Sequence, residues 1–332
     1  MLSDWLPDYG AQQISNSLLA LDQMGLRWSN FDTSLKVRLI QSVSNNVEHF
    51  NAQEISNSLL ALDQMGLRWS HFDADLQAKL MDSVRRNVKS FNAQEIANSL
   101  LALDQMGLRW SDFDDGLRAK ILDSISRNVV RFNAQDIANS LLALDQMGLR
   151  WSNFDADLRS DLMGSVRRNV ESFNAQEIAN SLLALDQMGL RWSHFDDGLQ
   201  ADLMNSLRRN VESFNAQNIA NSLLALDQMG LRWSNFDADL RSDLMGSVRR
   251  NVESFNAQEI ANSLLALDQM GLRWSHFDDG LRAKILDSIS RNVESFNEQG
   301  ISNSLLALDQ MGLRWSHFDN GLQAKLLDSV RR

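Results

Sequence analysis

Residues 91–131 read FNAQEIANSLLALDQMGLRWSDFDDGLRAKILDSISRNVVR, and this 41-residue stretch decides the fold because the chain repeats it eight times with small changes. A fixed period of about 20–50 residues is typical of stacked repeat proteins, in which one repeat is too small to bury its apolar face alone. Positions within the repeat are numbered from an aromatic residue at position 1. That residue is Tyr9, Phe50, Phe91, Phe132, Phe173, Phe214, Phe255 or Phe296.

The first half of the repeat predicts a helix. Asn92, followed three residues later by Glu95, resembles a capping box at a helix start, and Gly107 is placed to end the helix. The spacing of apolar residues gives this helix one side suited to burial. That side carries Ala93, Ile96, Leu100 and Leu103, flanked by Ala97 and Leu101.

The second half predicts another helix, which begins near Ser111 or Asp114. Every fourth residue is apolar, which is typical of a buried stripe. The series is Phe113, Leu117, Ile121, Ile125 and Val129. Aspartates crowd the start of this helix and arginines its end, where they complement the helix dipole, and we interpret these charges as solvated helix ends.

The predicted fold is therefore all-α, an α-solenoid of eight helix-turn-helix repeats. Residues 1–8 are predicted to be an N-terminal lead-in, and residues 9–332 a single solenoid domain. The repeats span 9–49, 50–90, 91–131, 132–172, 173–213, 214–254, 255–295 and 296–332.

Composition narrows the functional class. The chain has no cysteine, which excludes disulfides and cysteine nucleophiles and is typical of the cytoplasm or another reducing compartment. The N-terminal stretch lacks the features of a signal peptide and the aliphatic runs are too short to cross a bilayer, so we expect a soluble protein; delivery into a host cell stays open. The net charge of −11 counts against a nucleic-acid partner unless positive charges are segregated, and it fits a basic peptide better.

The first helix carries a resemblance to a known family. Its sequence at 91–103, followed by Met106 and Gly107, resembles the octotricopeptide repeats and the related repeats of FAST-kinase-like, RAP-domain proteins, whose first helix typically reads F-x-P-Q-E-L-A-N-T-L-W-A-L-A-K-L-G. The matching residues are Phe91, Gln94, Ala97, Asn98, Ala102, Leu103 and Gly107, and they recur in all eight repeats. The resemblance covers the first 17 of each 41 residues, and it implies helical hairpins that bind RNA.

The same segment departs from that family pattern at several positions. Ala93 stands at the usual proline, Leu101 at the usual tryptophan, and Asp104–Gln105 at the usual small and basic pair. The basic residue that would contact phosphate from the first helix is therefore absent.

The stripe opposite the apolar side of the first helix is the predicted ligand groove, with contributions from repeat positions 5, 8, 12 and 15. Position 12 is an invariant alanine, such as Ala102. Position 5 varies and is the candidate for selecting a ligand: Gln13, Glu54, Glu95, Asp136, Glu177, Asn218, Glu259 and Gly300. Positions 8 and 15 offer a ladder of amides: Asn57, Asn98, Asn139, Asn180, Asn221 and Asn262, with Gln105, Gln146, Gln187 and Gln228. Such amides suit base edges, or the backbone of an extended peptide, or bonds that hold the stack together.

Position 19 is an arginine in every repeat, which gives candidate phosphate contacts. Those candidates are Arg109, Arg150, Arg191 and Arg232. However, the invariant aspartate at position 14, such as Asp104, lies on the packed side of the helix and needs a partner, so we favour an Asp104–Arg109 ion pair over a phosphate contact. Tryptophans at position 20 and methionines at position 16 are interpreted as packing between repeats.

We expect no enzyme, cofactor, metal site, membrane partner or small-molecule substrate. The carboxylates form a periodic surface, and the histidines at position 22 (His71, His194, His276 and His317) lack companion ligands and are interpreted as surface loop residues. The leading hypothesis is a modular binder of single-stranded RNA along the first-helix face, at about one nucleotide per repeat. The alternative is a protein–protein interaction scaffold that grips an extended basic peptide through the amides and the position-5 carboxylates.

Overall fold

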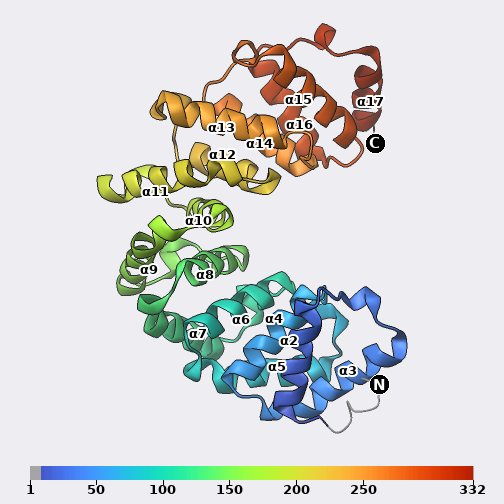
Figure 1. Ribbon diagram of the computed structural model, residues 1–332, viewed down its shortest axis with the longest axis vertical. Helices are drawn as coiled ribbons and strands as arrows, with labels where there is room; N and C mark the ends of the chain where they lie inside the picture. The colour runs from blue at the N-terminus through green and yellow to red at the C-terminus, as the bar shows by residue number, and fades with distance from the viewer. Residues whose placement is uncertain (1–8, 332) are drawn as a thin grey trace. The chain divides into compact units, whose positions relative to one another are not determined.

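The computed structural model describes residues 9–331 and the side chains of residues 9–329. The predicted lead-in, residues 1–8, lies outside the described residues. Every regular element within residues 9–331 is helical, so the predicted α-solenoid is confirmed (Figure 1). Within the same residues, no helix combines the length and the apolar character that a membrane span requires.

The chain divides into two compact units, of which the first ends at Asn169 and the second begins at Val170. In the N-terminal unit the first helices of the repeats are α2 (Ala11–Gln23), α4 (Ala52–Gln64), α6 (Ala93–Gln105) and α8 (Ala134–Gln146). Its second helices are α3 (Thr33–Asn46), α5 (Ala74–Asn87), α7 (Asp115–Asn128) and α9 (Ala156–Asn169).

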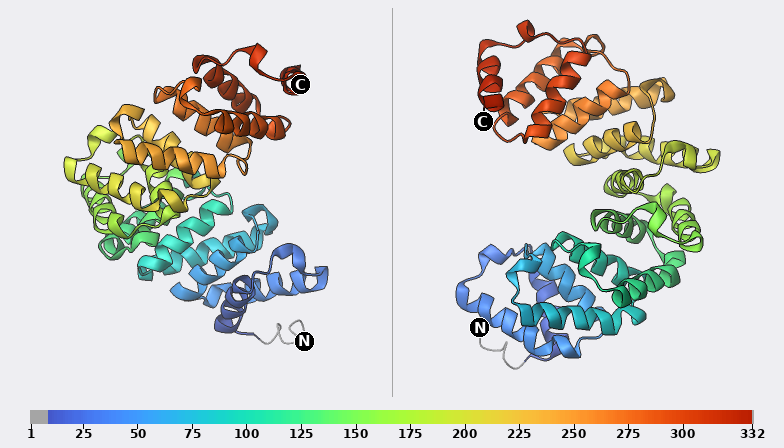
Figure 2. Two further views of the ribbon diagram at one scale, coloured as in Figure 1. Left: turned by 45° about the horizontal axis from the view of Figure 1, so that its top comes forward. Right: turned by 180° about the vertical axis from the view of Figure 1, so that it is seen from behind.

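The C-terminal unit has the same order. Its first helices are α10 (Ala175–Gln187), α12 (Ala216–Gln228), α14 (Ala257–Gln269) and α16 (Glu298–Gln310). Its second helices are α11 (Asp197–Asn210), α13 (Ala238–Asn251), α15 (Asp279–Asn292) and α17 (Asn320–Arg331). Figure 2 shows this alternation in each unit from two further sides.

The predicted helix boundaries have clear local causes. The Asn92 side chain accepts a hydrogen bond from the Glu95 N–H, and the Glu95 carboxylate accepts one from the Asn92 N–H, each at 2.9 Å. Gly107 ends the first helix with φ +101°, a left-handed conformation that costs glycine little. Of the two predicted starts of the second helix, Asp114 is correct, because its side chain caps α7. Ser111 lies instead in a short 3-10 helix, η6 (Trp110–Asp112).

First helices of consecutive repeats pack directly against one another, α4 on α6 and α6 on α8 in the N-terminal unit. The position-12 alanines lie at this contact, and all seven from Ala61 to Ala307 are 0% exposed. The prediction that position 12 belongs to an exposed stripe is therefore wrong. The first helices α4, α6, α12 and α14 each pack against another first helix on two sides, and only a small side chain lets two helices approach closely.

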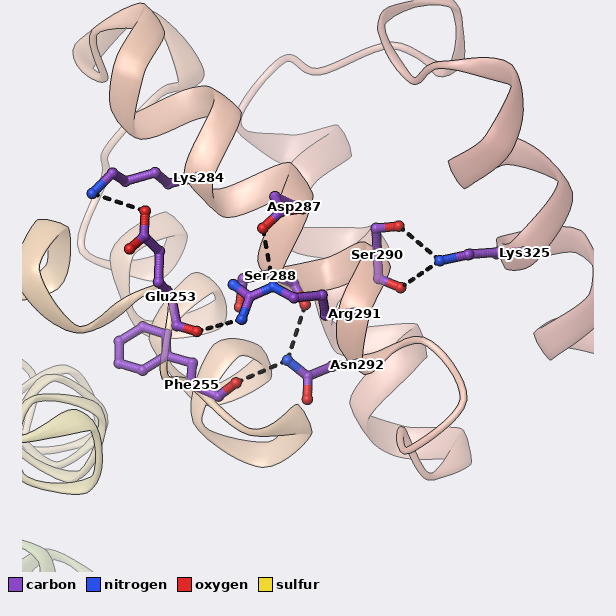
Figure 3. A network of polar contacts seen from close by, with 9 residues as sticks. All are labelled: Glu253, Phe255, Lys284, Asp287, Ser288, Ser290, Arg291, Asn292 and Lys325. Carbon is purple, nitrogen blue, oxygen red and sulfur yellow. Dashed lines mark hydrogen bonds and ion pairs between the residues drawn. The ribbon is translucent and has the colours of Figure 1, made fainter.

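The apolar stripe of the second helix is confirmed, since Phe113, Leu117, Ile121, Ile125 and Val129 are all buried. At the end of that helix, Asn128 donates to the carbonyl oxygen of Phe91 at the start of its own repeat, at 2.9 Å. Figure 3 shows the equivalent bond from Asn292 to Phe255 in the C-terminal unit. These amides fasten the end of the second helix to the start of the repeat.

The arginines at the ends of the second helices are not simply solvated, contrary to the prediction. Arg85 pairs with Asp114, the N-cap of the next second helix, and Arg249 pairs in the same way with Asp278. The next arginine along the chain reaches backwards, as Arg86 does to the carbonyl oxygen of Val47. The arginines therefore bind consecutive repeats together, because a helix end in a solenoid faces a neighbouring repeat as well as solvent.

Candidate functional site

The position-5 side chains are used by their own helices. Glu54, Glu95, Glu177 and Glu259 each accept a hydrogen bond from the N-cap N–H of the same helix. Asp136 and Asn218 are 5% and 4% exposed and make the same contact. Gln13 is exposed, and Gly300 has no side chain to offer. Position 5 thus has a structural role, and its part in ligand selection stays a prediction.

The two amide positions differ in accessibility. The position-8 asparagines are half-buried from Asn57 to Asn139, and Asn180 is 7% exposed. Within residues 9–331, no hydrogen bond joins these amides to a neighbouring loop. The position-15 glutamines, by contrast, are exposed throughout, Gln105, Gln146, Gln187 and Gln228 included. The accessible amides therefore lie at the C-terminal ends of the first helices.

The favoured aspartate–arginine ion pair is confirmed at that same end. The Nη1 atom of Arg109 lies 3.6 Å from Oδ1 of Asp104, and equivalent pairs occur in all eight repeats at 3.0–4.0 Å. The two partners differ in accessibility. In the six pairs from Arg68 to Arg273 the aspartate side chain is 2–3% exposed, whereas the arginine side chain is 53–59% exposed.

Each of these arginines is held through one nitrogen. All the ion pairs and hydrogen bonds that the structure gives their side chains use Nη1. In the case of Arg109, Nη1 also donates to the backbone carbonyl oxygen of Gln146. The Nη2 and Nε atoms form the other edge of the guanidinium group. We call the eight position-19 arginines, Arg27, Arg68, Arg109, Arg150, Arg191, Arg232, Arg273 and Arg314, the arginine ladder.

Burial makes four of the paired aspartates unusually weak acids. It raises the pKa of Asp104 and of Asp186 to about 7, and that of Asp63 and of Asp227 to about 6. The attraction of the paired arginine lowers each pKa but is outweighed by the loss of hydration, and an adjacent aspartate in the row raises the pKa further. Near neutral pH, part of the positive charge on the ladder is therefore not cancelled.

These groups line a groove in the N-terminal unit with a volume of about 830 Å³. Its lining comes from repeat positions 14, 15, 17 and 19 of the first repeats, so that the same polar groups recur once per repeat. Arg27 and Arg68 lie along it together with Asp22, Asp63 and Gln64. The groove presents alternating amide and guanidinium groups to a ligand.

A hollow lies on the other side of the arginine ladder, between the loops of consecutive repeats. Between the second and third repeats it has a volume of about 650 Å³ and is lined by Arg68, Trp69, Met81, Met106 and Asp112, among others. A hollow of about 530 Å³ occupies the equivalent place between the third and fourth repeats. We call these surface depressions the inter-repeat hollows.

Comparison with known proteins shows to which family these repeats belong. The repeat family described as "Protein of unknown function (DUF1601)" matches residues 24–59, 65–100, 106–141, 147–182, 188–223, 229–264 and 278–305, which is most of the chain. The chain belongs to the DUF1601 family. None of the curated proteins with which the chain was compared gives a match.

The first six DUF1601 matches begin at the position-16 methionine, so each of them contains a complete loop with the arginine of position 19 and the tryptophan of position 20. In the third repeat these are Arg109 and Trp110. The Trp110 backbone N–H donates to the Met147 carbonyl oxygen at 3.0 Å, so the backbone at this position joins two repeats. The predicted packing of the tryptophan side chain between repeats is only partly correct, because Trp110 is half-buried and its ring meets the Phe113 ring edge-to-face at 5.8 Å. Part of the indole therefore stays accessible in the inter-repeat hollow.

Two sets of residues in the DUF1601 repeats were not singled out from the sequence as structurally important. The position-38 asparagines, such as Asn128, fasten each second helix to the start of its repeat, and their constancy in the first seven repeats was a usable signal. The position-22 residues are exposed in the loops, and each accepts a hydrogen bond from the N–H of a ladder arginine, as His71 does from Arg68 at 3.0 Å. Position 22 varies only among asparagine, histidine and aspartate, which all carry an acceptor atom, and this restriction was the usable signal.

Proposed function

We propose that this protein is a non-catalytic, modular binder of single-stranded RNA, which takes about one nucleotide per repeat along the arginine ladder and the inter-repeat hollows. The observation that carries this proposal is the single-sided engagement of the ladder arginines. Because Asp104 and the helix end at Gln146 hold only Nη1 of Arg109, the guanidinium group is fixed in place while its other edge is directed away from those partners.

The exposed edge of a guanidinium group suits the phosphates of an RNA backbone. Its Nη2 and Nε atoms can donate two parallel hydrogen bonds to one phosphate, and arginine is favoured wherever such bidentate recognition is needed. The buried aspartate keeps the arginine in one orientation, so that less side-chain entropy is lost when the ligand binds. A row of such arginines, one per repeat, would offer one phosphate contact for each nucleotide bound.

The inter-repeat hollows supply a surface for the bases. Trp69 and Trp110 are half-buried there, and a flat aromatic ring can stack on any base. The resemblance of the first helix to octotricopeptide repeats points towards the same ligand. The net charge of −11 opposes RNA binding in general, but the weak acidity of the buried aspartates leaves positive charge on the ladder itself.

A scaffold for a basic peptide is the competing function. It depends on the position-5 carboxylates, and those of Glu177 and Glu259 already accept hydrogen bonds from their own helix starts. This use of the carboxylates favours RNA over the peptide. Replacing both residues by glutamine should weaken a basic peptide ligand and leave RNA affinity unchanged.

The first test is equilibrium binding of the whole chain to a randomised pool of single-stranded RNA at roughly 150 mM salt, with sequencing of the bound fraction. Sub-micromolar retention with an enriched motif of up to about eight nucleotides would support the proposal. Retention of lysine-rich peptides from a parallel library, without retention of RNA, would support the scaffold and overturn the RNA proposal.

A further inference from the structure

The residues at repeat position 22 alternate among only three types along the chain. They are Asn30, His71, Asp112, Asn153, His194, Asn235, His276 and His317, and all eight are exposed. Most of the loop around them is constant, since the arginine at position 19, the tryptophan at position 20 and the serine at position 21 never change. A variable residue within a constant surface is where one repeat can differ from the next in what it binds.

Each of these residues makes one identical contact. Its side chain accepts a hydrogen bond from the backbone N–H of the ladder arginine three residues earlier, at 2.6–3.0 Å. The contact caps the short 3-10 helix of the loop, which explains why only residues with an acceptor atom at the right reach occur there. The cap does not explain why the three types alternate.

The contact also fixes what each side chain presents outward. His71 accepts through Nδ1, so in the neutral ring the proton is on Nε2, which becomes a donor. Asn153 accepts through Oδ1 and leaves its NH₂ group as a donor. Asp112 accepts through Oδ2 and leaves Oδ1 as an acceptor. Seven repeats therefore present a donor at this place, and the third repeat alone presents an acceptor.

Two of these residues, Asp112 and Asn153, line the inter-repeat hollows defined above. Asp112 lines the hollow that also contains Arg68 and Trp69 of the preceding repeat, and Asn153 lines the next one, with Trp110. A ligand whose backbone is held at the ladder arginine, and whose ring lies on the tryptophan, would bring its edge towards the position-22 residue. The hydrogen-bonding pattern of that edge would then decide how well it fits.

We propose that the position-22 residues determine the base specificity of each repeat, an assignment that rests on the proposed RNA-binding function. Repeats with histidine or asparagine prefer bases with an acceptor edge, such as O4 of uracil or O6 of guanine. The third repeat, with Asp112, prefers a base with an amino group, such as N4 of cytosine or N6 of adenine. The order of these residues along the chain is the order of preferences along the RNA.

The decisive variant exchanges two neighbouring residues, Asp112→Asn together with Asn153→Asp. Both residue types already cap this loop in the same protein, so the thermal unfolding of the variant should match that of the parent chain. In selection from the randomised RNA pool, the amino-base preference should move by one nucleotide, from the third repeat to the fourth. Affinity for the parent motif should fall on the order of 5-fold for each mismatched repeat, as expected for the loss of one hydrogen bond, and should recover on RNA that carries the same exchange.

A second pair of variants separates hydrogen-bonding character from size. His194→Asn keeps an outward donor and should leave the preference at the fifth repeat unchanged, whereas His194→Asp replaces the donor by an acceptor and should reverse it. If all three variants bind RNA with the parent motif and the parent affinity, position 22 is only a loop cap and the assignment is overturned, while RNA binding stands. If the parent chain retains no RNA, the proposed function and this assignment fall together.

Discussion

The Nη1 atom of Arg191 lies 3.3 Å from Oδ1 of Asp186, and the aspartate side chain in this pair is only 2% exposed. The other carboxylate oxygen, Oδ2, is buried without a hydrogen-bond partner among the described residues. The pair therefore combines an accessible cation with a carboxylate that is incompletely satisfied. A buried charge in this situation destabilises the folded state, and protonation relieves the cost.

Stability should consequently fall as the pH rises from about 4 to about 7. Unfolded aspartates titrate near pH 4, whereas burial raises the pKa of folded Asp186 to about 7 and that of Asp227 to about 6. Between these values the folded state holds protons that the unfolded state has released, so each unit of pH lowers the free energy of unfolding. The midpoint of thermal unfolding, measured from pH 4 to pH 8, should decline across this window.

Replacing the aspartates Asp63, Asp104, Asp186 and Asp227 by asparagine should flatten that decline. The control replaces Asp157 and Asp239, which are exposed on α9 and α13, and should keep it. Below about pH 4 the trend should reverse in every variant, because Arg85 holds the pKa of Asp114 well below its usual range and that ion pair is lost on protonation. A midpoint that rises from pH 5 to pH 8 in the parent chain would contradict this prediction.

Removing three ladder arginines should weaken RNA binding and its dependence on salt. The variant carries Arg68→Gln, Arg109→Gln and Arg150→Gln, together with asparagine at the paired aspartates, so that no buried charge loses its partner. Each phosphate contact on a single strand contributes about 0.7 to the slope of log K against log salt, so the slope should decrease by about 2.

The matched control for this variant replaces only the three paired aspartates and keeps the arginines. It should bind RNA at least as tightly as the parent, because no carboxylate then offsets the positive charge of each guanidinium group. An arginine variant that retains its helical circular dichroism and an unchanged salt slope would show that the ladder does not contact phosphates.

The tryptophan in an inter-repeat hollow should contribute to affinity through its ring. Trp110→Leu should cost about 1–3 kcal/mol of binding free energy, the usual loss when one base loses its stacking partner. Trp110→Phe keeps a flat ring and should cost less. Tryptophan fluorescence should be quenched on RNA binding, and unquenched emission from a saturated complex would argue against stacking.

Two glycines should respond in opposite directions to alanine. Gly107 has φ +101° with open space around the site of a Cβ atom, so Gly107→Ala should cost about 1–2 kcal/mol through backbone strain alone. Gly164 lies inside α9 and meets only the flexible end of Arg168, so Gly164→Ala should stabilise by about 0.5–1 kcal/mol. Urea denaturation of the two variants measures both effects, and a change of the same sign in their free energies of unfolding would contradict this prediction.

What the sequence predicted correctly was local. The capping box of Asn92 and Glu95, the glycine stop at Gly107 and the Asp104–Arg109 pair join residues no more than five positions apart, and they follow from helix geometry alone. The buried stripes also follow from a periodicity that one repeat contains by itself. For these reasons the fold and the aspartate–arginine pairs of the candidate site could be predicted from the sequence.

The remaining features depend on how one repeat is placed against the next. Ala102 was expected on an open stripe, yet it is buried because a first helix has neighbours on two sides. The bond from Arg109 to the Gln146 carbonyl oxygen spans 37 residues, and no pattern within one repeat specifies it. The inter-repeat hollow, with Asp112 at its edge, likewise exists only once two loops lie side by side.

The backbone bond from Trp110 to the carbonyl oxygen of Met147 recurs with the same spacing in Trp69 to Met106 and, in the C-terminal unit, in Trp192 to Met229. Because donor and acceptor are the same at each of these joints, excising 41 residues from the interior of a unit would bring an equivalent donor opposite an equivalent acceptor. Recombination between near-identical copies in the gene can thus lengthen or shorten the array without remaking a joint. In such a protein the number of repeats can change more easily than the contacts that join one repeat to the next.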